Sequence, residues 1–288
     1  MELGLHVADF TWAGGAPELG RALARAVGDA EDSGIARVTV MDHFWQIGHD
    51  LGPYENAMLE AYTTLGFLAA HTSRVRLHTL VTGAVYHDPG VLAKQVTTLD
   101  VLSGGRAGLG IGAGWFADEA RGLGLPFPSV ARRFDMLEET LSVVLQMWSG
   151  DERPYEGEYY RLGRPLNSPA PLTRPHPYLM IGGSGERRTL PLVARHADAC
   201  NIFGGPEAGR KLDVLKRHCE AVGRDHEEIE KTSVLSVTSG TTTDTLVRGL
   251  LDLRATGFTA VYVYGCGFDD PREAVDLIAS TLPEVAEA

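Results

Sequence analysis

The residues best suited to chemistry are an aspartate and a histidine that follow a short apolar run. Residues 35–41 (IARVTVM) have the composition of a buried strand, and Asp42 and His43 come directly after it. An imidazole with a pKa of about 6.5 can accept or donate a proton near neutral pH. His43 is therefore a candidate acid or base, and the alternative is a hydrogen-bonded structural histidine.

A glycine-rich turn is the second candidate site. The sequence GGSG at 182–185 lies between an apolar strand and a helix predicted over 186–196, whose first turn would carry Arg187 and Arg188. Free backbone amides and positive charge at a helix N-terminus can bind a phosphate group. The turn is either such a phosphate site or an ordinary connection between a strand and a helix.

The third candidate is a strand at 107–112 in which glycine alternates with Leu109 and Ile111. Glycine inside a strand costs stability and usually means that something approaches the backbone closely. We interpret these glycines as a surface on which a flat ligand would lie. A dinucleotide-binding loop is set aside, because the glycines fall inside the strand and not in a turn that opens a helix.

The elements that must position these residues alternate between strand and helix. Residues 75–115 have the pattern of strand, loop, helix, tight turn and second strand, which is one β-α-β unit. Eight such alternations at nearly even spacing predict a (β/α)8 TIM barrel more strongly than a doubly wound open sheet. We expect residues 1–288 to form a single domain, with an inserted segment at 149–177 before strand five.

Reactive groups of such a barrel lie at the C-terminal ends of its strands. The chain has no HxH or HExxH motif for a metal-dependent hydrolase and no GxSxG motif for a serine nucleophile. Strand seven ends in Ser236-Val237-Thr238-Ser239 without a glycosidase carboxylate, and no lysine follows a strand as a Schiff base requires. Glycines, hydroxyls, aromatic rings and one histidine remain, which favours a cofactor site without a metal.

Several other polar and aromatic residues are assigned less specific roles. Asp118 and Glu119 are expected to be an ordinary helix start, with a catalytic role as the alternative. His87 and His176, each near a proline, are expected to be loop residues. Three tryptophans near strand ends could form a wall for an aromatic ligand: Trp12, Trp45 and Trp115.

Composition limits the partners and the compartment. A formal charge of −12 and a pI of about 5.3 argue against nucleic acid and anionic membranes, and leave a small molecule as the partner. Three widely spaced cysteines without a CxxC motif predict free thiols in a reducing compartment. The N-terminus lacks the features of a signal peptide and no apolar run is long enough to span a membrane, so we expect a cytoplasmic protein.

Five segments together resemble the luciferase-like monooxygenase superfamily, and within it the oxidoreductases that use the deazaflavin coenzyme F420. The resemblance extends from strand one to about Asp225. It depends on DHF at 42–44, LVT at 80–82 with Asp88-Pro89, LDVLSGGRAGLGIGAGW at 99–115, and IGGSGERRTLPLVARHADACN at 181–201.

The resemblance implies a bacterial luciferase-like barrel, usually a homodimer, with the cofactor ring across its mouth. Asp42 and His43 would be the catalytic residues near the reactive centre, and a bulge with a non-prolyl cis peptide at Thr79-Leu80 would support the ring. The implied cofactor-binding residues are Asp42, His43, Thr79, Leu80, Thr82, Gly112, Ala113, Trp115, Gly182, Gly183, Ser184, Gly185 and Arg187. Trp115 stands where the sugar-phosphate dehydrogenases of the family carry a catalytic glutamate, so the acid must lie elsewhere or the substrate must differ.

The resulting hypothesis is an enzyme that transfers a hydride between C5 of the deazaflavin and a small organic substrate. The alternatives are a two-component monooxygenase that uses FMN, and a flavin- or deazaflavin-binding protein without turnover.

Overall fold

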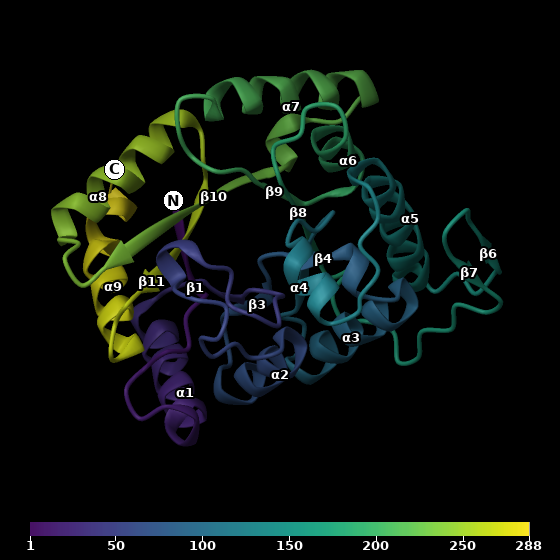
Figure 1. Ribbon diagram of the computed structural model, residues 1–288. Coiled ribbons are helices and arrows are strands. Elements are labelled where there is room, and N and C mark those ends of the chain that lie inside the picture. The colour runs from purple at the N-terminus through teal and green to yellow at the C-terminus, as the bar shows by residue number, and fades with distance from the viewer. Residues whose placement is uncertain (288) are drawn as a thin grey trace.

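A ring of parallel strands forms the centre of the molecule, with helices around it (Figure 1). The computed structural model describes residues 1–287. In chain order the strands are β1 (Glu2–Val7), β2 (Arg37–Val40), β3 (Arg76–Thr79), β4 (Thr82–Gly83), β5 (Gly108–Gly112), β8 (Tyr178–Gly182), β9 (Ala199–Asn201), β10 (Glu230–Thr238) and β11 (Ala260–Cys266).

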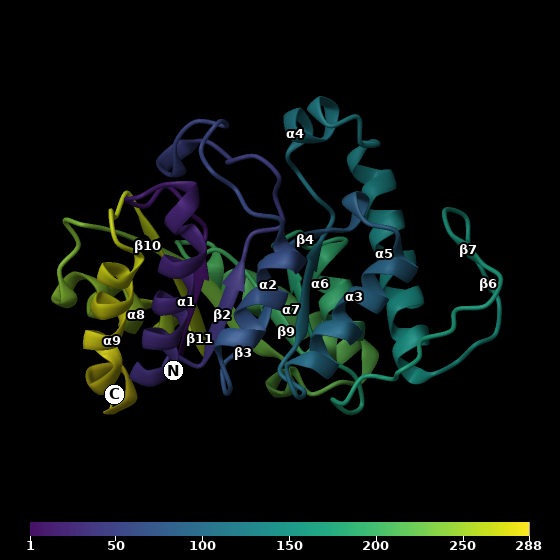
Figure 2. The ribbon, with the colours of Figure 1, turned by 90° about the horizontal axis from the view of Figure 1, so that it is seen from below.

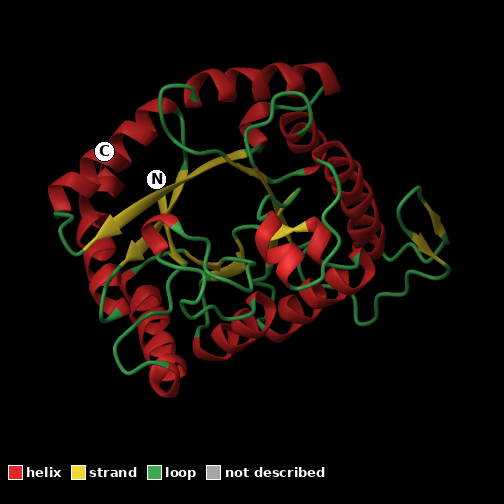
Figure 3. Cartoon of the chain, in the orientation of Figure 1, coloured by secondary structure: helices red, strands yellow, loops and turns green. Residues whose placement is uncertain are grey.

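The sheet order is β3-β2-β1-β11-β10-β9-β8-β5-β4, and every pairing in it is parallel. The amide of Leu77 in β3 donates to the carbonyl of Arg106 before β5 (2.9 Å), and Leu77 forms a parallel bridge with Ala107. This contact joins the two ends of the sheet into the ring seen end-on in Figure 3. The predicted TIM barrel is therefore confirmed, with its third strand divided into β3 and β4.

The helices follow the strands as the sequence predicted. They are α1 (Ala16–Ser33), α2 (Ala61–His71), α3 (Pro89–Leu102), α4 (Ala117–Gly122), α5 (Val130–Ser149), α6 (Thr189–His196), α7 (Ala208–Val222), α8 (Thr243–Thr256) and α9 (Pro271–Glu287). Local signals set the start of α3. Asp88 accepts hydrogen bonds from the amides of Gly90 and Val91, and Pro89 occupies the first turn. None of the helices in residues 1–287 is both long and apolar enough to cross a bilayer.

Two segments extend beyond the strand ends opposite the termini, namely α4 and the long segment between β2 and α2 (Figure 2). We call this open end of the barrel the mouth. Between α5 and β8 the chain leaves the barrel and forms a small hairpin of β6 (Tyr155–Glu156) and β7 (Arg161–Leu162) beside α5.

The other end of the barrel is closed by polar side chains that point inward. Arg37 is 2% exposed and forms ion pairs with Glu2 and with Glu230 (2.5 Å). His78 Nε2 and the Tyr262 hydroxyl lie 2.9 Å apart, and the same hydroxyl accepts a hydrogen bond from the Arg37 guanidinium (3.3 Å). A ligand can therefore reach the inside of the barrel only through the mouth.

The third strand is interrupted by a bulge at 79–82, which contains a cis peptide between Leu80 and Val81. The sequence analysis expected this bond at Thr79-Leu80, which is wrong by one residue. Val81 is half-buried at the mouth, and its neighbour Leu80 is 9% exposed.

The glycines of β5 provide space for this bulge. A Cβ atom on Gly110 would lie 2.1 Å from the Thr79 carbonyl oxygen, and one on Gly112 would lie 3.3 Å from Val81 Cγ2. A Cβ atom on Gly108 would lie 2.9 Å from the Tyr178 carbonyl oxygen. The interpretation of these glycines as a surface for a flat ligand is therefore wrong for Gly108 and Gly110, because protein atoms fill the space beside them.

Candidate active site

His43 and Glu119 form a hydrogen-bonded pair at the mouth. His43 follows β2, and Glu119 lies in the first turn of α4 with no exposed surface. His43 Nδ1 lies 3.0 Å from Glu119 Oε1, while the amides of Phe44 and Trp45 donate to Oε2 at 2.6 and 2.9 Å. Burial alone would raise the pKa of Glu119, but these hydrogen bonds lower it below its usual range.

The ionised Glu119 fixes the tautomer of His43. A carboxylate can only accept hydrogen bonds, so Nδ1 must donate, and the neutral ring then carries an unprotonated Nε2. The ring also contacts Trp115 edge-on, with 5.6 Å between the centroids, and Trp115 is 57% exposed. The structure therefore brings His43 and Trp115 together at the mouth. It also places the carboxylate of Glu119 against His43.

Glu119 lies at a helix start as expected, and the contact with His43 keeps its alternative role open. A signal was present in the sequence, because two acidic residues follow strand four closely. It did not distinguish the exposed Asp118 from the buried Glu119.

Asp42 lies deeper than His43. Its side chain is 1% exposed, and its Oδ2 atom is 2.8 Å from His87 Nε2 and accepts from the Gly83 amide (3.3 Å). Asp42 thus joins the end of β2 to β4 and holds a second histidine. His87 lies in the loop before α3, as predicted, and there it pairs with a buried carboxylate.

The threonines of the bulge are structural. Thr79 and Thr82 are fully buried; the Thr79 hydroxyl donates to the Gly110 carbonyl (2.8 Å) and the Thr82 hydroxyl donates to Thr79 Oγ1 (2.9 Å). Tyr62 completes this chain, with its hydroxyl 2.7 Å from Thr82 Oγ1. Their hydroxyls are engaged within the protein, and the expectation that Thr79 and Thr82 contact a cofactor stays a prediction. Leu80 and Val81 remain as the surface of the bulge.

The turn at 182–185 leaves the barrel between β8 and α6. Gly183 has a φ of +116°, which favours glycine, and its amide donates to the Asn201 carbonyl (2.9 Å). Within residues 1–287 the amides of Ser184, Gly185 and Glu186 donate to no protein atom. These amides are therefore available to an anion at the N-terminus of α6.

The charges around this turn leave one free cation among the described residues. Helix α6 begins at Thr189, so Arg187 and Arg188 precede it and do not lie in its first turn as expected. Arg188 pairs with Asp135 (2.5 Å), whereas Arg187 is exposed and forms no ion pair with any residue in 1–287. Glu186 is neutralised by Arg210 and Lys211 at 2.8 and 2.5 Å.

The predicted tryptophan wall is present only in part. Trp45 is half-buried and Trp115 is exposed at the mouth, but Trp12 is 7% exposed and packs in the hydrophobic core beside Phe10. No group of three or more His, Cys, Asp or Glu side chains in the described residues could hold a metal ion.

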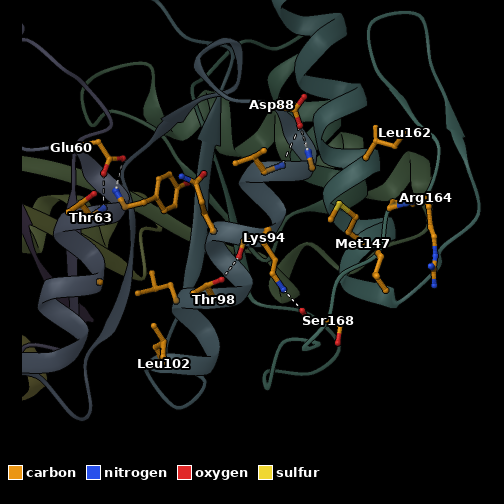
Figure 4. A pocket seen from close by; sticks show the side chains of 18 residues that line it. Glu60, Thr63, Asp88, Lys94, Thr98, Leu102, Met147, Leu162, Arg164 and Ser168 are labelled. Atoms are coloured by element: carbon orange, nitrogen blue, oxygen red, sulfur yellow. Dashed lines mark hydrogen bonds between the residues drawn. The ribbon is translucent and has the colours of Figure 1, made fainter.

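A large groove lies elsewhere, on the outer surface between α2, α3 and the segment that follows α5 (Figure 4). Its volume is about 760 Å³, and the Lys94 ammonium donates to the Ser168 carbonyl across it (2.5 Å). None of its lining residues belongs to the predicted site. The mouth of the barrel, not this groove, therefore carries the candidate chemistry.

A family model described as luciferase-like monooxygenase matches residues 1–277. The chain belongs to this family. An uncharacterised Mycobacterium tuberculosis protein is 39% identical over 140 residues, which are 49% of this chain and 48% of that protein. The F420-dependent glucose-6-phosphate dehydrogenase of Nakamurella multipartita is 32% identical over 260 residues, covering 88% of this chain and 73% of the dehydrogenase. The chain thus spans about half the length of the first relative and more of the second.

Solved structures of this family share the fold. An F420-dependent secondary alcohol dehydrogenase in complex with an F420-acetone adduct has a TM-score of 0.84 at 16% identity, covering 99% of this chain and 98% of that one. The oxygenating constituent of a Pseudomonas putida diketocamphane monooxygenase in complex with FMN has a TM-score of 0.78 at 17% identity, covering 99% of both chains. At these identities the likeness supports the barrel alone.

Proposed function

We propose that this protein is a coenzyme F420-dependent oxidoreductase that transfers a hydride between the deazaflavin and a small organic substrate. The observation that carries the proposal is the placement of His43, bonded through Nδ1 to Glu119, at the same mouth as a turn with backbone amides at 184–186 that are unpartnered within residues 1–287. The 32% identity to an F420-dependent dehydrogenase over most of the chain supports the choice of cofactor.

The residues at the mouth fit the charge and shape of such a cofactor. The amides of Ser184 and Gly185, together with Arg187, offer donors and positive charge to a phosphate group. The half-buried Val81 and its neighbour Leu80 present an apolar surface to a planar ring. A proposed contact set then includes Gly182, Gly183, Gly112, Ala113 and Trp115, which lie along the ends of β5 and β8.

When bound, coenzyme F420 supplies a two-electron hydride donor or acceptor at C5 of its ring. His43 Nε2 then accepts the hydroxyl proton of a substrate that is oxidised, or returns a proton to the oxygen of one that is reduced. Glu119 holds the ring and stabilises the imidazolium that forms. Asp42 acts through position, because its carboxylate binds Gly83 and His87 beneath the mouth.

An anaerobic titration of the purified protein with F420 and with FMN, each oxidised and reduced, tests the cofactor. We expect F420 to bind more tightly than FMN, detected by fluorescence quenching. In His43→Ala we expect binding to persist while hydride transfer falls by about 100-fold or more. Unchanged turnover in His43→Ala would remove His43 from the chemistry, and failure of F420 to bind would refute the proposal.

FMN is the second candidate, because an FMNH2-dependent dimethylsulfone monooxygenase of Pseudomonas putida is 29% identical over 167 residues. The same titration decides between the two rings. Tight FMN binding with oxygen consumption by the reduced complex would favour the monooxygenase. Binding of either ring without turnover of any donor would favour a carrier.

The proposal assigns residues 1–288 to one catalytic domain in a homodimer, with 149–177 as an inserted segment. Exposed apolar side chains along the outer groove support self-association, among them Val91 and Leu102 of α3. Light scattering on the wild type and on Leu102→Glu tests this, with a dimer expected only for the wild type. A cytoplasmic location is consistent with three cysteines that are all free and buried.

A further inference from the structure

The barrel order divides the mouth into two halves. The anion-binding turn follows β8, and the Val81 bulge lies next to β5, so a cofactor as proposed above would occupy the β8-β5-β4 side. The strands β1, β11 and β10 lie on the opposite side of the ring and are left for the substrate. The following inference concerns this second half and depends on the proposed function.

The side chains that point into this half are polar but uncharged. Ser236 of β10 and Tyr264 of β11 are register partners, and the ring of His6 in β1 meets Tyr264 edge-on with 6.0 Å between the centroids. His6 is 6% exposed and lies 2.9 Å from the Thr39 hydroxyl. Burial lowers the pKa of His6 to about 4, so its ring is neutral at pH 7. Val234 lies two residues before Ser236 on the same face of β10, deeper in the barrel, and it is half-buried, so solvent reaches this depth.

The loops around this half of the mouth offer no basic side chain to neutralise an anionic substrate. The loops that follow these strands and β2, at 8–15, 41–60, 239–242 and 267–270, contain neither lysine nor arginine. Their charged residues are acidic apart from histidine: Asp9, Asp42, Asp50, Glu55, Glu60, Asp269 and Asp270.

The charges next to these loops also disfavour an anion. Arg272 at the start of α9 is already paired with Asp270 (2.6 Å). Burial raises the pKa of Cys266 and of Tyr264; the charges of Asp9 and then Asp50 raise the pKa of Cys266 further, and the charge of Asp50 adds to that of Tyr264. An anionic group in this half would lose its hydration and meet Asp50 without a positive partner.

We infer that the substrate is an uncharged organic molecule, bound by the hydroxyls of Tyr264 and Ser236 and by His6, and that phosphorylated sugars and carboxylates are rejected. The chain would thereby differ in substrate class from the glucose-6-phosphate dehydrogenases that it resembles in sequence.

The test uses three hydride acceptors of one shape: naphthoquinone, its sulfonate and its quaternary ammonium derivative. A quinone takes the hydride from reduced F420 and one proton, giving the hydroquinone. For each acceptor the rate with the reduced F420 complex is divided by the rate with free reduced F420. We expect this acceleration to be about tenfold or more larger for the neutral quinone than for the sulfonate.

Two variants change the charge of this half of the mouth. Ser236→Lys supplies a cation and Asp50→Asn removes an anion, and we expect each to raise the acceleration of the sulfonate, by about tenfold in Ser236→Lys. Ser142→Lys adds the same charge on the exposed face of α5, away from the mouth, and should leave the three values unchanged.

Three results would overturn the inference: a wild-type acceleration of the sulfonate equal to that of the neutral quinone, a preference for the ammonium derivative, or no response of the sulfonate to Ser236→Lys. Fluorescence quenching by F420 is measured first on the same samples. Normal F420 binding with any of these results refutes the substrate class alone, whereas loss of F420 binding in the wild type refutes the proposed function.

Discussion

Replacing Glu119 by glutamine tests the pair that prepares His43. The carboxylate is fully buried and accepts three hydrogen bonds, from His43 Nδ1 at 3.0 Å and from two backbone amides at 2.6 and 2.9 Å. Each bond to a charged acceptor contributes about 1.5–3 kcal/mol, and a neutral amide retains roughly half of that. Glutamine also places an NH2 group among three donors, so at least one bond is lost.

We expect Glu119→Gln to slow hydride transfer by about 10–100-fold, which corresponds to about 1.4–2.8 kcal/mol. The affinity for F420 should change little, because the Glu119 carboxylate bonds to His43 and to two backbone amides and not to the turn at 182–185. Single-turnover rates and fluorescence titration measure the two effects.

Asp118→Asn is the matched control, because Asp118 is the neighbouring carboxylate of α4, 60% exposed and paired only with Arg121. Its rate should equal that of the wild type. A Glu119→Gln enzyme with a normal rate would show that Glu119 only holds the backbone, and the assignment of the His43 tautomer would fail.

Three further changes have defined outcomes. Gly110→Ala places a methyl group 2.1 Å from a backbone oxygen of β3 and should lower the free energy of unfolding by about 1–3 kcal/mol or more, measured by thermal unfolding. Gly66→Ala, in open space on α2, should leave the stability unchanged or raise it. Glu31→Gln should lower the free energy of unfolding by about 2 kcal/mol at pH 7. Hydrogen bonds from three backbone amides and a hydroxyl outweigh the effect of burial and lower the pKa of Glu31 from 4.5 to about 2. Denaturant titrations should therefore show the full difference above pH 4.5 and lose it as the pH falls toward 2. Arg187→Ala should weaken F420 binding about tenfold in low salt, and Arg195→Ala on the same helix should not; equal affinities would move the phosphate elsewhere.

The barrel could be predicted because its signals are local. A β-branched run, a turn residue and a helical spacing of apolar residues each act within a few positions, as at the start of α3, where Asp88 and Pro89 define the helix. The position of His43 and of the 182–185 turn at one end of the molecule followed from the parallel order of the strands alone.

Two errors are local, namely the cis peptide displaced by one residue and the start of α6. The others concern contacts between distant parts of the chain. Glu119 meets His43 across 76 positions, and only the closed ring brings the end of β2 near α4. The glycines of β5 indicated correctly that space was needed beside the strand. The period of a strand does not reveal what fills that space, and beside Gly108 and Gly110 it is the backbone of Tyr178 and of Thr79 and not a ligand.

The most direct test of the central claim is the electron density of crystals of this protein soaked with F420. We predict a planar ring at the mouth, with one face against Leu80 and Val81, His43 beside it, and the phosphate on the amides of Ser184 and Gly185. Density for the ring outside the mouth, such as in the groove between α2 and α3, or a phosphate bound away from the 182–185 turn, would contradict the account.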